Sequence, residues 1–196
     1  MQRVKRLLQL IPLVEQAGLI DMSGGSFAVR EAAGVYVTPQ RVGEQWHWKL
    51  AEQDFVLFPG GGEASMARAG RRPCRESRLL RAILAAFPAW NAVWHGHPWG
   101  LLGYAIAGQP LQVPPHHAYA ALGGERPATV PCVAYTRDEE SEVVDALKRA
   151  FDKTACGAVI VSGIGPFVAA TEMEPAVAFG EALENLARAQ QWRLKA

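Results

Sequence analysis

The sequence predicts an α/β protein in which helices cover a central β-sheet. Apolar residues recur at helical spacing in five segments, short apolar runs bounded by glycine or proline lie between them, and the two kinds of segment alternate along the chain. This alternation does not determine the strand order. At 196 residues the chain has the length of one ordinary domain, so a single domain over residues 1–196 is predicted.

Helices are predicted where leucine, valine and isoleucine recur at steps of three and four residues. In residues 3–17, Val4, Leu7 and Ile11 share one face, and Gly18 follows as a stop signal. The same spacing predicts four further helices, over 76–87, 98–107 with Pro98 first, 138–151 with Asp138 as N-cap, and 172–190.

Strands are predicted in short apolar runs between turn residues. They cover 26–30, 35–38, 54–58, 91–97, 127–135, 157–163 and 165–171. The glycine-rich segment 59–73 lacks the Gly-Lys-Ser/Thr ending of a P-loop, so we interpret it as a hairpin loop rather than a phosphate cradle.

The charge balance and the lengths of the apolar stretches argue against two classes of partner, nucleic acids and membranes. Hydrophobic residues make up 49% of the chain, and 20 basic residues stand against 19 acidic ones, which is typical of a globular protein without a polyanionic partner. No nucleic-acid binding is therefore predicted. No apolar stretch approaches the ~18 residues that a membrane-spanning helix needs, so no membrane partner is predicted either.

The cysteines and the first segment bear on the compartment. Residues 1–14 combine a basic start with an apolar run, but Gln9 interrupts the run and no convincing cleavage site follows. Cys74, Cys132 and Cys156 are an odd number without a Cys-x-x-Cys pair, which argues against a disulfide framework or a zinc ribbon. We therefore expect a cytoplasmic protein.

The stretch NAVWHGHPWG contains the strongest chemical signal. His95 and His97 are two apart on a predicted strand, so their side chains point to one face with Cα atoms about 7 Å apart. From that separation two imidazoles can converge on one ion at ~2.1 Å each. Two histidines at this spacing are weak evidence alone, because any such pair satisfies the geometry.

Three other residues are candidates by position. His116 and His117 adjoin each other in a proline-rich loop, where a metal role competes with that of a solvated or hydrogen-bonded pair. Glu76 lies in the first turn of a predicted helix, where it is either an acid/base group or a favourable charge at the helix N-terminus.

The order of motifs carries a family resemblance. The segments GGSFAVR, YVTP, RRPCRE, FPAWNAVWHGH, PPHHAYAALGG and VPCVAY, followed by a late glycine-bearing hairpin, resemble the class II aldolase/adducin family from about residue 5 to 190. The resemblance implies a three-layer α/β/α sandwich with a mainly antiparallel central sheet. It also implies a homotetramer with active sites between subunits, and zinc or a similar divalent ion that stabilises an enediolate.

Carried over by motif position, the resemblance assigns the metal and catalytic residues. His95 and His97 match the first two metal histidines, and Glu76 matches the carboxylate that acts as acid/base. The third metal histidine is replaced by Ile164, so His116, His117 or Glu76 is needed as a substitute ligand, and His116 is assigned to the metal. His117 stands where the aldolases have a tyrosine and is assigned a catalytic role.

The phosphate-binding residues of the family are also replaced. Its serine pair corresponds to Cys74 and Arg75, its asparagine to Ser26, and its threonine-glycine turn to Gln40 and Arg41. Ser26, Gln40, Arg41 and Arg75 are therefore the expected substrate-binding residues. Either arginine can bind an anion through its guanidinium fork or remain a solvated surface charge.

Three functions remain open at this point. The first is a metal-dependent lyase, or a related epimerase or dehydratase, acting on a small sugar or sugar phosphate. The second is a divergent member that holds a metal weakly without a third histidine and takes a differently charged substrate. The third is an adducin-like binding or assembly module with a degenerate metal site. A homo-oligomer is expected in each case.

Overall fold

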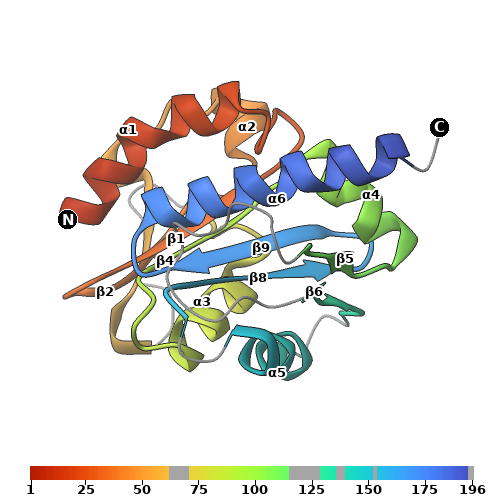
Figure 1. Cartoon of the computed structure of the whole chain (residues 1–196). Coiled ribbons are helices and arrows are strands. Elements are labelled where there is room, and N and C mark those ends of the chain that lie inside the picture. Colours follow the sequence, from red (N-terminus) through yellow and green to blue (C-terminus); the bar gives the residue numbers. More distant parts are fainter. Residues whose placement is uncertain (62–70, 115–128, 136–139, 152–153, 194–196) are drawn as a thin grey trace.

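The computed structural model describes residues 1–61, 71–114, 129–135, 140–151 and 154–193. A central sheet lies between two helical layers, which confirms the predicted three-layer α/β/α sandwich (Figure 1). One layer contains α1 (Gln2–Gln16), α4 (Trp99–Ala107) and α6 (Met173–Arg193), and the other contains α3 (Ser77–Ala86) and α5 (Glu140–Phe151).

The main sheet has seven strands in the order β3-β2-β1-β4-β9-β8-β7. Every neighbouring pair is antiparallel except β7 and β8, so the sheet is mainly antiparallel as predicted. The strands are β1 (Ser26–Glu31), β2 (Gly34–Val37), β3 (Val56–Phe58), β4 (Ala92–His95), β7 (Cys132–Val133), β8 (Cys156–Val161) and β9 (Gly165–Ala170). A separate pair joins β5 (Leu111–Gln112) to β6 (Thr129–Val130).

The register of the three central strands brings distant segments together. His95 at the end of β4 is opposite Ser26 at the start of β1 and opposite Phe167 of β9. The loop before β1, the segment after β4 and the tip of the β8–β9 hairpin therefore meet at one edge of the sheet.

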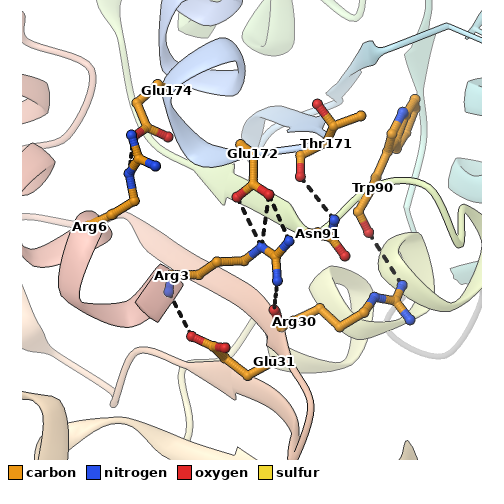
Figure 2. A network of polar contacts seen from close by, with 9 residues as sticks. All are labelled: Arg3, Arg6, Arg30, Glu31, Trp90, Asn91, Thr171, Glu172 and Glu174. Atoms are coloured by element: carbon orange, nitrogen blue, oxygen red, sulfur yellow. Dashed lines mark hydrogen bonds and ion pairs between the residues drawn. The ribbon is translucent and has the colours of Figure 1, made fainter. Parts of the chain in front are cut away.

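Charged side chains connect α1 to the sheet and to α6 (Figure 2). The Arg3 backbone N–H donates to Glu31 Oε1 at 2.7 Å, and its guanidinium donates to both carboxylate oxygens of Glu172. One turn further on, Arg6 pairs with Glu174 at 2.8 Å. These contacts join α1 to the end of β1 and to the start of α6.

Trp94 connects β4 to α6 in the core. Its ring is fully buried, and its Nε1–H donates to the Ala176 carbonyl of α6 at 3.0 Å. Opposite the ring lies Gly180, where a Cβ atom would come within 2.0 Å of Trp94 Cζ2. The glycine lets the α6 backbone approach the strand that ends in His95.

Several element boundaries differ from the sequence prediction. The strand predicted over 91–97 stops at His95, and Pro98 is the N-cap of α4 rather than its first residue. The strand predicted over 127–135 divides at Pro131, which has no N–H to donate to a ladder. Asp138 lies outside the described residues, as does most of segment 59–73, of which residues 59–61 form a 3₁₀ turn.

Two short helices were not predicted, namely α2 (Val42–Trp46) and the 3₁₀ turn Glu52–Asp54. Both are shorter than two helical turns, which is too short for a repeating apolar pattern. Within the described residues no helix is long and apolar enough to cross a membrane.

We predict that Gly180→Ala destabilises the fold. Alanine favours a helix over glycine by about 1 kcal/mol, but overpacking a core costs about 1–3 kcal/mol, and the buried Trp94 ring has no room to move. The expected net loss is about 1 kcal/mol or more, measured by urea unfolding. The control is Glu181→Ala on the exposed side of the same helix, and a Gly180→Ala variant as stable as the wild type would contradict the packing argument.

Candidate active site

A cleft of about 500 Å³ lies at the edge of the sheet where β4 ends. Five segments that are far apart in the sequence contribute to its wall. These are residues 22–25, 39–44 and 74–76, the two histidines at 95 and 97, and the hairpin tip at 163–164.

His95 is held inside the wall of this cleft. Only 2% of the residue is exposed, and its ring stacks on Phe167 with 4.5 Å between ring centres. Its Nδ1 lies 3.0 Å from the Pro166 carbonyl oxygen, which can only accept a hydrogen bond, so Nδ1 carries the proton.

The surroundings of His95 also keep it uncharged. Burial lowers its pKa to about 4, against the opposing effect of the Pro166 carbonyl and with a smaller lowering from His97. At neutral pH the imidazole is therefore neutral and leaves Nε2 with its lone pair free of a proton. A histidine that binds a metal through one nitrogen while the other donates to a backbone carbonyl has this arrangement.

His97 is more open to solvent and lies against the loop before β1. Its Nδ1 is 3.4 Å from Ser23 Oγ and 3.9 Å from Asp21 Oδ1. Asp21 in turn accepts hydrogen bonds from the backbone N–H groups of Ser23 and Gly24, which hold the loop in a tight turn. A Cβ at Gly24 would lie 2.3 Å from His97 Cε1, so this position has no room for a side chain while His97 keeps its place.

The two imidazoles are placed as a pair. Their ring centres are 5.1 Å apart and their planes are at 82°. Two imidazoles on one tetrahedral ion at ~2.1 Å have ring centres about 5 Å apart, so the spacing fits two ligands of one metal. The predicted proximity of His95 and His97 is therefore present in the fold.

The hairpin tip closes this end of the cleft without adding a ligand. A Cβ at Gly165 would lie 3.2 Å from His95 Cε1 and 3.7 Å from His97 Cδ2, and the preceding residue, Ile164, lines the cleft. No group of three histidine, cysteine, aspartate or glutamate side chains able to hold a metal occurs in the part of the chain that the structure describes. Among the described residues, the candidate metal donors at this edge of the sheet are therefore the two imidazoles of His95 and His97.

The two remaining histidine candidates cannot be placed. His116 and His117 both fall in residues 115–128, outside the described part of the chain. Their assignments as metal ligand and catalytic residue therefore stay predictions.

Glu76 lines the same cleft from the start of α3, where it is the N-cap residue. The adjacent Cys74 is 4% exposed, and burial followed by the charge of Glu76 raises the pKa of its thiol far above the usual value. The thiol is protonated at neutral pH and is unsuited to act as a nucleophile. Glu76 is thus the carboxylate on this part of the wall, and its acid/base role stays a prediction.

Three of the four predicted substrate-binding residues line the cleft, namely Gln40, Arg41 and Arg75. Arg41 adopts a left-handed conformation, with φ of 62°, and its Nε donates to Glu44 Oε2 at 2.8 Å. This hydrogen bond raises the pKa of Arg41 and turns part of its guanidinium toward a carboxylate. Arg75 is exposed at the rim.

Ser26 is placed differently from the other three. It pairs with His95 in the sheet, is 0% exposed and is not among the residues that line the cleft. Its Oγ has no hydrogen-bond partner among the described residues, and the Cys74 thiol is a polar group beside it. A direct contact of the Ser26 hydroxyl with substrate would require the wall to open.

Glu184 of α6 holds the start of α4 close to the two histidines, and the sequence did not indicate this role. Its carboxylate is 2% exposed and accepts from the backbone N–H groups of Gly100 at 2.8 Å and Leu101 at 2.9 Å. These groups form the N-terminus of α4, which begins two residues after His97. A carboxylate at this end complements the helix dipole, but nothing in the local sequence of α6 shows that Glu184 faces inward.

The fold and the paired histidines define a class II aldolase-like protein. Residues 5–191 match the family model of the class II aldolase and adducin N-terminal domain, and the chain belongs to this family. The resemblance inferred from the motifs is thereby confirmed. No curated protein matches the sequence significantly.

Solved structures share the fold across most of their length. L-fuculose 1-phosphate aldolase superposes with a TM-score of 0.79 at 17% identity, covering 99% of this chain and 87% of that one. The L-fuculose-1-phosphate aldolase of Thermus thermophilus gives 0.73 at 19% identity, covering 94% and 90%. The sugar-phosphate aldolase of Thermotoga maritima gives 0.72 at 14%, covering 99% and 95%. At identities this low the likeness shows the fold alone.

We predict that Gly24→Ala displaces His97 while leaving the fold intact. The new methyl group would overlap the His97 ring, which is partly exposed and can rotate away, so the melting temperature should change by only a few degrees. The His97 imidazole resonances should shift strongly in NMR spectra, while those of His95 should shift less. Leu13→Ala, at an exposed position of α1, is the control, and an unmoved His97 resonance in Gly24→Ala would refute the close contact.

Proposed function

We propose that the chain is a divergent class II aldolase-like lyase, or a related epimerase or dehydratase, acting on a small sugar or sugar phosphate. The observation that supports this most is the pair of imidazoles at 5.1 Å facing a cleft that Glu76 also lines. Two imidazoles beside a carboxylate supply part of the set of groups that metal-assisted proton transfer next to a carbonyl needs.

His95 and His97 would hold a divalent cation, with zinc the best match to two imidazoles. When bound, such an ion supplies Lewis-acid polarisation of a substrate carbonyl or hydroxyl oxygen. His116 is the proposed third ligand. His95 is fixed by Pro166 and Phe167, so its orientation is set before any ligand arrives.

Glu76 would move the proton. Its carboxylate at the start of α3 can accept a proton from a substrate hydroxyl and return it to carbon after carbon–carbon cleavage. His117 is the proposed second catalytic group, at the position where the aldolases have a tyrosine.

The charged side chains that line the cleft indicate how it could bind an anionic substrate. Among the described lining residues Arg41 and Arg75 are balanced by Glu44 and Glu76. Because Arg41 already pairs with Glu44, Arg75 is the cation best placed to bind an anionic group, with Gln40 as a neutral donor. A divalent ion would give the cleft the net positive charge that a sugar phosphate requires.

We further propose a cytoplasmic homo-oligomer. Cys74, Cys132 and Cys156 are all free thiols, which suits a reducing compartment. Trp99 and Trp192 are each 79% exposed on α4 and α6, the two helices that pack together in one outer layer. Large exposed aromatic side chains are enriched at subunit interfaces.

A second candidate function is an adducin-like binding or assembly module with a degenerate metal site. Ile164 favours it, because an aliphatic side chain lines the cleft at the motif position of the third ligand. The replacement of the family's serine pair by Cys74 and Arg75 also favours a binding module. Metal binding distinguishes the two candidates.

The first test is metal content, measured by plasma emission spectroscopy on protein purified without chelator or polyhistidine tag. We expect about one equivalent of zinc or another divalent metal per chain, and loss of that metal in His95→Ala. Ile164→His should have the opposite effect and raise the zinc affinity at least about tenfold, because it adds an imidazole at the hairpin tip.

The control for both variants is Ile164→Val, which keeps the hairpin apolar. Absence of metal from the wild type, even after incubation with zinc or manganese, would exclude the lyase and favour the binding module. An unchanged affinity in Ile164→His would show that the hairpin tip is not positioned for a ligand.

The second test concerns Glu76. In a screen of ketose phosphates and unphosphorylated ketoses for aldehyde release, Glu76→Gln should lower kcat by about a hundredfold or more while metal content stays the same, since only proton transfer is removed. Glu44→Gln, at a second carboxylate that lines the cleft, is the matched control. Turnover of the Glu76→Gln variant at the wild-type rate would eliminate the proposed acid/base role.

A further inference from the structure

The loop before β1 approaches His97 with a hydroxyl group and a carboxylate. Ser23 Oγ lies 3.4 Å from His97 Nδ1, and Asp21 Oδ1 lies 3.9 Å from the same nitrogen. Both oxygens are therefore on the Nδ1 side of the ring. This arrangement bears on which nitrogen of His97 carries its proton.

The Asp21 carboxylate holds this loop in a tight turn. Its Oδ1 accepts hydrogen bonds from the Ser23 N–H at 2.8 Å, from the Gly24 N–H at 2.9 Å and from the Ser23 hydroxyl at 2.7 Å. The Asp21 N–H closes the turn by donating to the Gly24 carbonyl oxygen at 3.2 Å. Two backbone groups and one hydroxyl thus converge on a single carboxylate oxygen.

The turn is anchored to the core by Trp48. The indole N–H of Trp48 donates to the Asp21 carbonyl oxygen at 2.9 Å, and its buried ring packs edge-on against Phe27 of β1. Gly43 of α2 leaves the space for this loop, because a Cβ atom there would come within 2.6 Å of the Asp21 carbonyl oxygen. The position of the turn is therefore set by packing and does not require a ligand in the cleft.

The direction of the Ser23 hydrogen bonds determines the tautomer of His97. A hydroxyl group has one proton and an ionised carboxylate can only accept, so the Ser23 proton is directed to Asp21. Toward His97 the Ser23 oxygen can then only accept, which requires the proton of the uncharged imidazole to be on Nδ1. The free lone pair of the ring is consequently on Nε2.

His95 reaches the same tautomer through a different partner. The Pro166 carbonyl oxygen lies 3.0 Å from its Nδ1 and leaves Nε2 without a proton. The two imidazoles, with ring centres 5.1 Å apart, therefore have the same nitrogen free to bind a ligand. An imidazole in the other tautomer would present an N–H group, which cannot coordinate a cation.

We propose that Asp21 and Ser23 are positioning residues that hold His97 in the Nδ1–H tautomer, with Nε2 free for a metal ion. This inference rests on the proposed function, in which His97 is a metal ligand. Because the Asp21 side chain is 49% exposed, its charge alone contributes little, and its main effect is to orient the Ser23 hydroxyl. Hydrogen-bond partners of this kind typically change metal affinity by about 10–100-fold.

The first test is the tautomer of His97, measured in the metal-free full chain by long-range proton–nitrogen NMR at mildly alkaline pH, where a free imidazole is uncharged. We expect the Nδ1–H form in the wild type. Ser23→Ala removes the acceptor, and Asp21→Ala releases the Ser23 hydroxyl to donate, so both variants should shift His97 toward the Nε2–H form. Ser23→Thr keeps the hydroxyl and Asp21→Asn keeps an acceptor oxygen, so both should retain the wild-type tautomer.

The second test is zinc affinity, measured by competition with a chelator. Ser23→Ala and Asp21→Ala should bind zinc about 10–100-fold more weakly than the wild type, and each conservative variant should lose less than the matching Ala variant. The control is Ser141→Ala, at an exposed position of α5 outside the cleft. Unchanged His95 resonances show which variants keep the cleft folded.

Three results would overturn the proposal. They are a wild-type His97 with its proton on Nε2, a His97 that keeps the Nδ1–H form in both Ala variants, and unchanged zinc affinity in both of these variants. A wild type that binds no zinc would instead count against the proposed function. In that case the tautomer measurement would still decide whether Asp21 and Ser23 position His97.

Discussion

The pairing of β4 between β1 and β9 is the constraint on which the rest of the structure depends. It places His95 opposite both Ser26 and Phe167, so the ring is buried, stacked and hydrogen-bonded to Pro166 before any ligand binds. The same pairing brings the loop before β1 and the β8–β9 hairpin tip to His97. A slip of one residue in this register would turn His95 to the opposite face and dismantle the cleft.

The two helical layers contact the central strands in different ways. On one side Trp94 and Glu184 join α6 to β4 and to the first turn of α4, which fixes the chain on both sides of His97. On the other side α3 follows directly after Glu76, its N-cap residue, which lines the cleft. Further along the same helix, Arg78 and Arg81 line a second cavity, so one helix contributes to two cavities.

Ile164 lines the cleft at the motif position where the family resemblance expects a metal histidine. With the described side chains alone, the charges of Arg41 and Arg75 are balanced by Glu44 and Glu76. The His95 imidazole is neutral, and His97 lies 3.9 Å from the Asp21 carboxylate. Under the proposed function, a divalent ion would supply the positive charge that an anionic sugar needs in this cleft. The charge of the substrate that this cleft would take therefore depends on whether the cleft binds a metal ion.

The amino-acid sequence by itself determined the fold class, the positions of the long helices and the β1–β2 hairpin, because local periodicity encodes amphipathic elements. It also determined the His95 and His97 pair and, through motif order, the family. Tertiary structure decided which groups meet: Ser26 is buried away from the cleft, Arg41 turns to Glu44, and Glu184 reaches α4 from 84 residues away along the chain. Short elements such as α2 depend on long-range packing and hydrogen bonding, which no local pattern records. The break at Pro131, in contrast, follows from a residue that is visible in the sequence.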